Sequence, residues 1–276
     1  MTMERRLNRF RGTVALVLGI GLGAWTTGYA QSLTWLGTLN GDWSEAYGVS
    51  ADGRVVVGQA RAAEGIRAFR WMEGVGMQDL GTLGGRESAA YSVSWDGRVV
   101  VGYAYNASGA YRAFRWVEGV GMQDLGTLGG CCSWALDVSW DGRVVVGWAD
   151  NATGQLRAFR WTQQTGMEDL NLTYAPLLTN GSVLAIAYAI SPDGRYIVGY
   201  GYNAATGRNQ EAFLLDTWRM GDTNGDGCID DSDLLTVLQA FGTPGTGLTR
   251  HEDINKDGVV DDADLLAVLF HFGEGC

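Results

Sequence analysis

A seven-residue motif, Asp-Gly-Arg-Val-Val-Val-Gly, constrains this chain most. It occurs verbatim at 52–58, 96–102 and 141–147, and as Asp-Gly-Arg-Tyr-Ile-Val-Gly at 193–199. Successive copies begin 44, 45 and 52 residues apart (96 − 52, 141 − 96, 193 − 141), and self-similarity at such a period indicates a repeat architecture. Asp-Gly favours a tight turn, and the apolar run after it is typical of a strand covered on both faces. The motif therefore predicts the hairpin tip and inner strand of a repeated β unit.

Each copy contains four strand signals, as the second one illustrates. Its expected strands are 89–94, 98–105, 111–118 and 122–128, joined by short connections that contain Gly. Such connections suit consecutive antiparallel hairpins, and four strands in about 45 residues is the size of a propeller blade. We therefore expect a mainly β, four-bladed propeller-like array over residues 31–218.

The two ends of the array predict how it closes. Residues 33–39 match only the fourth strand of a blade, whereas the last copy has its third strand at 211–215 and nothing like a fourth. We expect the amino-terminal strand to complete the last blade, which would remove exposed sheet edges. An open stack of repeats is the alternative.

Two further positions recur in the copies. A small residue stands at one place in every first strand, and an aromatic pair spaced by two stands on one face of the third strand. These are Ala46, Ala90, Ala135 and Ala187, and Phe69/Trp71, Phe114/Trp116 and Phe159/Trp161. We expect the aromatic pairs to stack between blades, with a sugar-stacking platform as the alternative.

The repeated pattern over residues 33–216 resembles the HAF-type extracellular repeat. The shared features are Asp-Gly, Val-Val-Gly, Ala-Phe-x-Trp and Leu-Gly-Thr-Leu. The His that gives the family its name is replaced by Arg67, Arg112, Arg157 and Glu211. The resemblance implies a secreted bacterial repeat protein, a family without an established activity.

The amino terminus has the pattern of a secretory signal. Four Arg and one Glu within 4–11 precede a short apolar run at 13–24, and Gly28 and Ala30 supply the small residues that a signal peptidase needs. We expect cleavage after Ala30, so that residues 1–30 are a signal peptide and the mature chain is secreted with no membrane span. An uncleaved anchor is the alternative, but the run is shorter than the roughly 20 residues a spanning helix needs.

Charge and residue content exclude several functions. The net charge is −11 and Lys256 is the single lysine, which disfavours nucleic acid and anionic membrane surfaces. Residues 31–218 hold no histidine, so neither a Ser–His–Asp nor a Cys–His arrangement can form there. We expect no catalytic and no organic cofactor-binding residues.

Some features of the array leave alternatives open. A carboxylate pair could hydrolyse a glycosidic bond, and the candidates near the repeat junctions are Asp42, Glu45, Glu87 and Asp137. The insertion at 171–183 marks a contact surface or is neutral. The adjacent Cys131 and Cys132 form either a vicinal disulfide or two thiols.

Residues 219–276 form a second, acidic module with two matching segments. Both have oxygen-bearing side chains at loop positions 1, 3, 5, 9 and 12, with Gly at position 6 and a residue at position 7 that offers its carbonyl. A hard cation with six to eight oxygen ligands needs this arrangement. The segments predict two calcium ions, bound by Asp222, Asn224, Asp226, Cys228, Asp230 and Asp233, and by Asp253, Asn255, Asp257, Val259, Asp261 and Asp264. Amphipathic helices are expected at 234–241 and 265–272.

Paired loops with Asp at position 12, each followed by one helix, resemble a type I dockerin. The resemblance implies the same twelve ligands, and it implies a cohesin-type or cell-surface partner for residues 219–276. Dockerins often present hydroxyls at loop positions 10 and 11, where this chain has Asp231-Ser232 and Asp262-Ala263. Because such modules bring their ends together, the resemblance also suggests a Cys228–Cys276 disulfide, with two free thiols as the alternative.

Two hypotheses for the function follow. The first is a secreted, non-catalytic binding or scaffold protein whose array carries a carbohydrate or protein ligand and whose dockerin-like module attaches it to a partner. The second is a component that degrades extracellular polysaccharide, such as a glycoside hydrolase, because dockerins are commonly appended to these enzymes.

Overall fold

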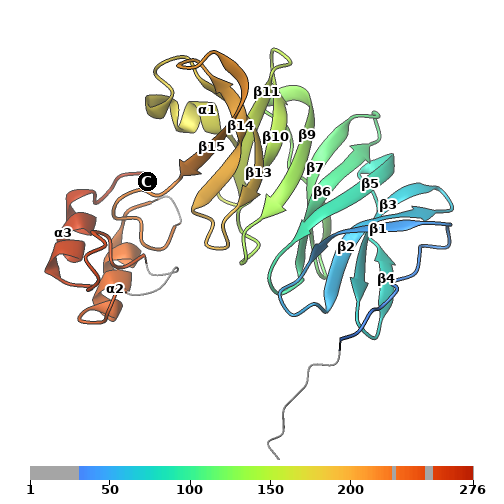
Figure 1. The fold of residues 1–276 in the computed structure, drawn as a ribbon, viewed down its shortest axis with the longest axis horizontal. Coiled ribbons are helices and arrows are strands. Elements are labelled where there is room, and N and C mark those ends of the chain that lie inside the picture. Colours follow the sequence, from blue (N-terminus) through green and yellow to red (C-terminus); the bar gives the residue numbers. More distant parts are fainter. Residues whose placement is uncertain (1–30, 226–227, 246–250, 276) are drawn as a thin grey trace, which may run out of the picture. The chain divides into compact units, whose positions relative to one another are not determined.

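The structure is a computed structural model that describes residues 31–225, 228–245 and 251–275 (Figure 1). It is mainly β, with four antiparallel sheets in chain order and a small helical region at the carboxyl end. This confirms the predicted fold class. The first three sheets have four strands and the last has three: β1 Ser44–Val49, β2 Val55–Ala62, β3 Gly65–Met72 and β4 Gly76–Asp79; β5 Gly84–Val93, β6 Val99–Asn106, β7 Tyr111–Val117 and β8 Gly121–Asp124; β9 Gly129–Val138, β10 Val145–Asn151, β11 Leu156–Thr162 and β12 Gly166–Asp169; β13 Val183–Ile190, β14 Tyr196–Asn203 and β15 Arg208–Asp216.

The repeated motif forms the turn between the first two strands of each sheet. In the second sheet, the Asp96 carboxylate accepts hydrogen bonds from the Ser94 hydroxyl at 2.7 Å and the Arg98 N–H at 3.0 Å. Gly97 has a φ of 73°, which favours glycine because a Cβ would be strained there. The same contacts recur at Asp52, Asp141 and Asp193. The motif therefore fixes each hairpin locally, as predicted.

The valine run that follows the turn is buried on both faces of its sheet. Val100 packs against the first sheet, whereas Val99 and Val101 pack against the third. Each seam between neighbouring sheets is thus filled by alternate residues of one strand. The expectation of a strand covered on both sides is confirmed for this inner sheet.

The aromatic pairs of the third strands also fill the seams. Phe114 and Trp116 pack on the first sheet, and Phe159 and Trp161 pack on the second. An arginine of the preceding sheet lies over each Trp ring, with Arg70 at 5.5 Å from the Trp116 centroid. These four rings are therefore packing elements, and the alternative of a sugar-stacking platform does not apply to them.

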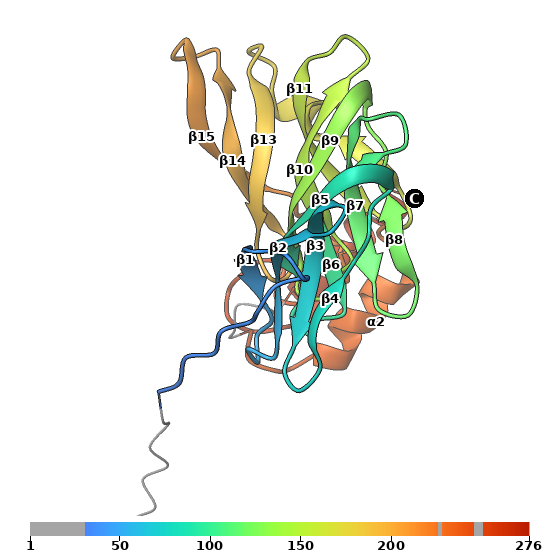
Figure 2. The same ribbon diagram turned by 90° about the vertical axis from the view of Figure 1, so that its right-hand side faces the viewer.

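The predicted closure of the array is not found. Residues 31–38 belong to no strand, and β15 pairs with β14 alone, so the fourth sheet keeps three strands (Figure 2). The three core clusters that join sheets each hold residues of two sheets that follow one another in the chain. Because none of these clusters joins the first sheet to the fourth, the two ends do not meet. Among the described residues the array is an open stack, which was the alternative.

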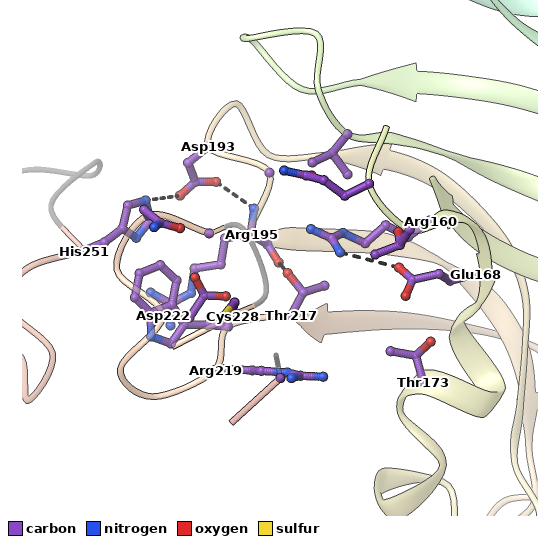
Figure 3. A pocket seen from close by; sticks show the side chains of 18 of the residues that line it. Arg160, Glu168, Thr173, Asp193, Arg195, Thr217, Arg219, Asp222, Cys228 and His251 are labelled. Atoms are coloured by element: carbon purple, nitrogen blue, oxygen red, sulfur yellow. Dashed lines mark hydrogen bonds and ion pairs between the residues drawn. The ribbon is translucent and has the colours of Figure 1, made fainter. Parts of the chain in front are cut away.

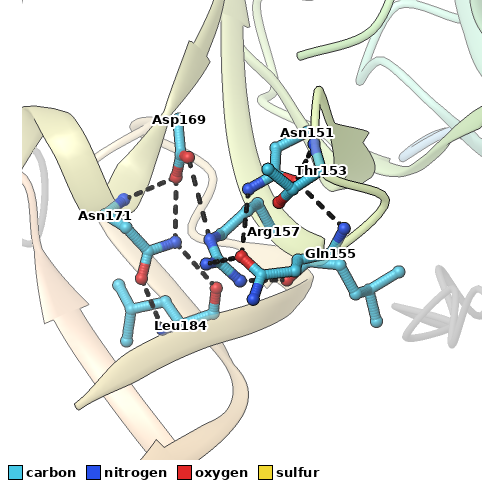
Figure 4. Close-up of polar contacts among 8 residues, drawn as sticks. Asn151, Thr153, Gln155, Arg157, Asp169, Asn171 and Leu184 are labelled. Carbon is cyan, nitrogen blue, oxygen red and sulfur yellow. Dashed lines mark hydrogen bonds and ion pairs between the residues drawn. The ribbon is translucent and has the colours of Figure 1, made fainter. Parts of the chain in front are cut away.

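The insertion before the fourth sheet is anchored by the side chain of Asn171 and by Leu170, which is fully buried in the core between the third and fourth sheets. It contains α1 (Leu170–Thr173) and the 3₁₀ turn η1 (Ala175–Leu177). The Asn171 amide accepts from the Leu184 N–H at 2.7 Å and donates to the Leu184 carbonyl at 2.9 Å and to Asp169 at 2.8 Å (Figure 4). Asn171 thereby ties the insertion to the start of β13.

The carboxyl-terminal module consists of two loop–helix segments around a shared apolar core. The helices are α2 (Asp231–Ala240) and α3 (Asp262–Phe270), which begin three residues before the predicted starts. Four fully buried residues form the core: Ile229, Val237, Val260 and Val268. No helix of the described part of the chain is long and apolar enough to cross a membrane, and the expected signal peptide, residues 1–30, lies outside the described residues.

Candidate metal centre

The structure places two of the predicted ligands of each segment, at loop positions 9 and 12, at the start of its helix. Asp230 and Asp261 are the N-caps of α2 and α3, and each accepts a hydrogen bond from a backbone N–H of the first turn. Asp226 lies outside the described residues, as does Cys276 of the expected disulfide. All twelve ligand assignments stay predictions, which the local geometry of the described residues supports.

The two position-12 aspartates hold the loops against the helices. Asp233 is fully buried, and its Oδ1 accepts from the Thr223 and Asn224 N–H groups at 2.7 and 3.0 Å. Its Oδ2 accepts from the Asp230 N–H at 3.0 Å, which completes a capping box. This reciprocal cap satisfies helix-end donors that have no partner within the helix.

Asp264 repeats this arrangement in the second segment. Its Oδ1 accepts from the Ile254 N–H at 2.6 Å and the Asn255 N–H at 3.1 Å, and its Oδ2 accepts from the Asp261 N–H at 2.9 Å. The side chain is fully buried. A carboxylate oxygen has more than one lone pair, so Asp264 can hold the backbone and still offer an oxygen to an ion.

The rest of the second loop fits a hard cation. Asp253 at position 1 accepts from the Gly258 N–H at 3.0 Å through Oδ2, while its buried Oδ1 has no hydrogen-bond partner. Gly258 at position 6 has a φ of 98°, which provides the sharp bend that such loops need. A buried carboxylate oxygen without a donor is costly, and a bound Ca²⁺ would remove that cost.

The carboxylate oxygens of this loop do not all point to one position. No three of Asp253, Asp257, Asp261 and Asp264 have oxygens within 4.8 Å of one another, although the whole loop is described. Asp257 instead accepts from the Asn255 amide at 2.9 Å. Four like charges repel one another, so a cation is needed to draw them together.

The described residues do contain one compact set of metal-binding groups elsewhere. Cys131, Cys132 and Asp150 lie within that distance, but the two cysteines form a vicinal disulfide. Their sulfurs are therefore not thiolates, which are the form that binds metal. This resolves the alternative left open for the cysteine pair and leaves it outside the metal centre.

The two helices, together with a phenylalanine just beyond each helix end, present matching rows of exposed apolar side chains. Each row has two leucines and a phenylalanine, and the rows are related by the 31-residue offset between Asp222 and Asp253. Their exposed fractions are 54, 51 and 45% in the first segment and 50, 53 and 47% in the second. The residues are Leu235, Leu238 and Phe241, and Leu266, Leu269 and Phe272. The ligand-spacing argument did not find this surface, although leucines at the same offset were a visible signal.

A pocket of about 390 Å³ lies where the last strand leads into the module (Figure 3). Arg195 forms a two-pronged ion pair with Asp216, with nitrogen–oxygen distances of 2.8 and 2.7 Å, and its guanidinium lies 5.0 Å from the Trp218 ring. The His251 ring stacks on Trp218 at 4.2 Å. Burial lowers the pKa of His251. The lining mixes arginines with carboxylates, so it selects neither anions nor cations.

Two of the four candidate carboxylates of the array, Glu45 and Asp137, have defined hydrogen-bond partners. Asp137 accepts from the Ser92 hydroxyl and the Ile190 N–H, which is a packing role between sheets. Glu45 accepts from Tyr47 and Gln59, and these hydrogen bonds lower its pKa, whereas a general acid needs a raised one. Both side chains thus take part in hydrogen bonds within the array.

Two solved structures are similar to part of this chain. TolB from Acinetobacter baumannii has a TM-score of 0.46 at 17% identity, over 65% of this chain and 41% of that chain. TolB from Agrobacterium tumefaciens has a TM-score of 0.47 at 17% identity, over 66% and 65%. This chain thus spans less than two thirds of the length of either protein.

Residues 220–271 match the family model of the dockerin type I domain. The carboxyl-terminal module is therefore dockerin-like in sequence as well as in its two loop–helix segments. Domains of this type generally bind calcium, attach to cohesins and occur in extracellular or cell-surface proteins. No curated protein matches the chain, and the HAF-type resemblance of the array remains a prediction.

Proposed function

We propose that this chain is a secreted, non-catalytic binding or scaffold protein, with a ligand-carrying array at residues 31–218 and a two-calcium attachment module at 219–276. Attachment is to a cohesin-type or cell-surface protein. The observation that carries the proposal is the pair of matching apolar rows on α2 and α3 and at their carboxyl ends, each following an acidic loop in the chain.

The apolar rows support a protein partner. Six large side chains, each about half exposed, are more than a module of this size leaves in water without a purpose. The two rows occupy equivalent places, so each helix offers a similar contact surface. Attachment would require calcium because both helices depend on the folded loops. The helices α2 and α3 each have ten residues or fewer, and helices of this length do not persist alone in water.

The array is the part of the protein that we propose binds a ligand. Its three core seams make it a stable support for a bound ligand. A carbohydrate or a protein on its surface is the ligand we propose, and a glycan array with chromogenic glycosides as a second readout tests this part. Turnover of any glycoside would refute the non-catalytic assignment.

The attachment is tested by isothermal titration of the mature chain with a type I cohesin, in calcium and in excess chelator. Binding is expected in calcium only. The double variant Leu238→Glu/Leu269→Glu places a charge in each apolar row and should abolish binding, while each single variant retains one intact row. Leu172→Glu is the matched control, because Leu172 is 77% exposed in the insertion. Equal binding by the double variant and the control would refute the helix surface as the contact.

A further inference from the structure

Each end of the open stack has one sheet face that no other sheet covers, although the equivalent faces inside the stack are packed against a neighbouring sheet. We call the face of a sheet that is turned toward the preceding sheet in the chain its leading face, and the opposite face its trailing face. Each internal seam packs the trailing face of one sheet on the leading face of the next. The first sheet has a leading face and the fourth sheet a trailing face with no neighbour in the stack. We infer that two copies of this chain associate head to tail, with the fourth sheet of each copy packed on the first sheet of the other.

The leading face of the first sheet is exposed at two positions that the other sheets bury, although Ala60 and Phe69 of the same face are fully buried within one copy. Val49 is 60% exposed, whereas its equivalents Val93, Val138 and Ile190 are 9, 6 and 8% exposed. Ala46 is exposed, but its equivalents Ala90, Ala135 and Ala187 are fully buried. Both positions are apolar in every copy, so the part of this face around Ala46 and Val49 has the composition of a packed surface but no sheet packed on it.

The trailing face of the fourth sheet shows the same mismatch. Val198 is 40% exposed, whereas its equivalents Val57, Val101 and Val146 are fully buried. Ala212 is exposed, but Ala68, Ala113 and Ala158 are fully buried. Leu214 is 68% exposed. At the equivalent position, the first and second sheets each have an arginine that lies over a Trp ring of the following sheet. In the pair of copies, Leu214 would cover Trp71.

Polar groups at the two ends match as well. In the first two seams an alanine N–H donates to a serine hydroxyl of the next sheet at 2.9 Å, from Ala68 to Ser88 and from Ala113 to Ser133. Ser44 is the equivalent serine, and it donates to the Gly37 carbonyl as Ser88 does to Gly81. Ala212 is the equivalent donor. One hydrogen bond of the internal seams cannot form between the two copies. Inside the stack, a backbone N–H in the turn of each sheet donates to the carbonyl of the equivalent residue in the next sheet, and this series ends at the carbonyl of Pro192, which has no N–H of its own.

The missing fourth strand is also accounted for. Residues 32–35 precede Leu36-Gly-Thr-Leu39 as β4 precedes Leu80-Gly-Thr-Leu83. Residues 32–35 of the second copy can therefore pair with β15 as β4 pairs with β3, which removes an exposed edge. Two copies give eight sheets, within the range of four to eight blades seen in closed propellers, whereas three copies give twelve. Closure at two copies follows.

Sedimentation of the mature chain in calcium tests the inference, with twice the monomer mass expected. Val49→Glu and Val198→Glu each place a buried charge in both junctions and should weaken association by about 100-fold. A mixture of the two variants should regain a dimer through its one junction without a substitution, because one variant keeps a native trailing face and the other a native leading face. Removal of residues 31–35 should also weaken association.

The controls separate this contact from other effects. Val75→Glu and Val120→Glu alter turns that are 73 and 83% exposed and should leave the dimer intact. Thermal unfolding of the array should not change in any of the four variants, since the substituted side chains are exposed within one copy. Leu238→Glu/Leu269→Glu should abolish cohesin binding and leave the dimer unchanged. A monomer at every concentration, a mixture that stays monomeric, or oligomers that grow beyond two copies would overturn the inference.

Discussion

Asp264→Ala is expected to uncouple the second loop from its helix. The substitution removes the acceptor of three backbone N–H groups, those of Ile254, Asn255 and Asp261. At a net contribution of about 1 kcal/mol per hydrogen bond, the loss is about 3 kcal/mol. Since 1.4 kcal/mol corresponds to a tenfold change, the calcium concentration that half-folds the segment should rise by about 100-fold, and further if Asp264 also binds the ion.

Hydrogen–deuterium exchange of the mature chain, measured against calcium concentration, reports this change in peptides that cover α3. In excess chelator α2 and α3 should exchange freely, and calcium should protect both, because metal that binds the folded state alone stabilises it by mass action. The array should exchange alike in both conditions, since its seams are independent of the loops.

Asp262→Ala is the matched control for this experiment. Asp262 is exposed in the first turn of α3 and takes no part in the capping box. Its loss should cost only the favourable charge at the helix start, at most about a fivefold change. Protection of α3 in excess chelator would refute the metal interpretation of the loops, and equal shifts for the two variants would refute the capping argument.

Three other outcomes are expected. Non-reducing peptide mass spectrometry should find Cys228 joined to Cys276, closing a loop of about 49 residues worth about 4 kcal/mol; alkylation of either residue would contradict it. Ser88→Ala should lower array stability by about 1–3 kcal/mol in urea unfolding, because a buried N–H loses its acceptor, whereas the exposed Ser108→Ala should not. The hydrogen bond from Arg195 lowers the pKa of Asp216, so the stability that this ion pair contributes is present above pH 4 and is lost as the pH falls. In thermal unfolding, Asp216→Asn should therefore be less stable than the parent at pH 7, and the two proteins should become equally stable in acid.

The Cys228–Cys276 expectation has support from the described backbone. The Ile229 N–H donates to the Glu274 carbonyl at 3.0 Å, and the Gly273 N–H donates to the Ile229 carbonyl at 2.7 Å. The last described residues of the module therefore lie next to the residue that follows Cys228, and the disulfide stays a prediction.

The sequence alone determined the parts of this protein that depend on near neighbours in the chain. The turn at Asp96-Gly97 is fixed by contacts within five residues, and so the hairpins and their period could be predicted. The loop positions of Asp253 and Asp264 were equally visible, because a cation needs its ligands at fixed spacings.

Only the tertiary structure decided how the repeats end. Whether four sheets close depends on the small rotation between neighbours, which is set by side chains about 45 residues apart packing in each seam. No local pattern encodes that sum of rotations, and for this reason the amino-terminal strand was wrongly expected to close the ring. The same limit hid the exposure of Val49 and Val198: their sequence context equals that of buried valines, and only the absence of a neighbouring sheet distinguishes them.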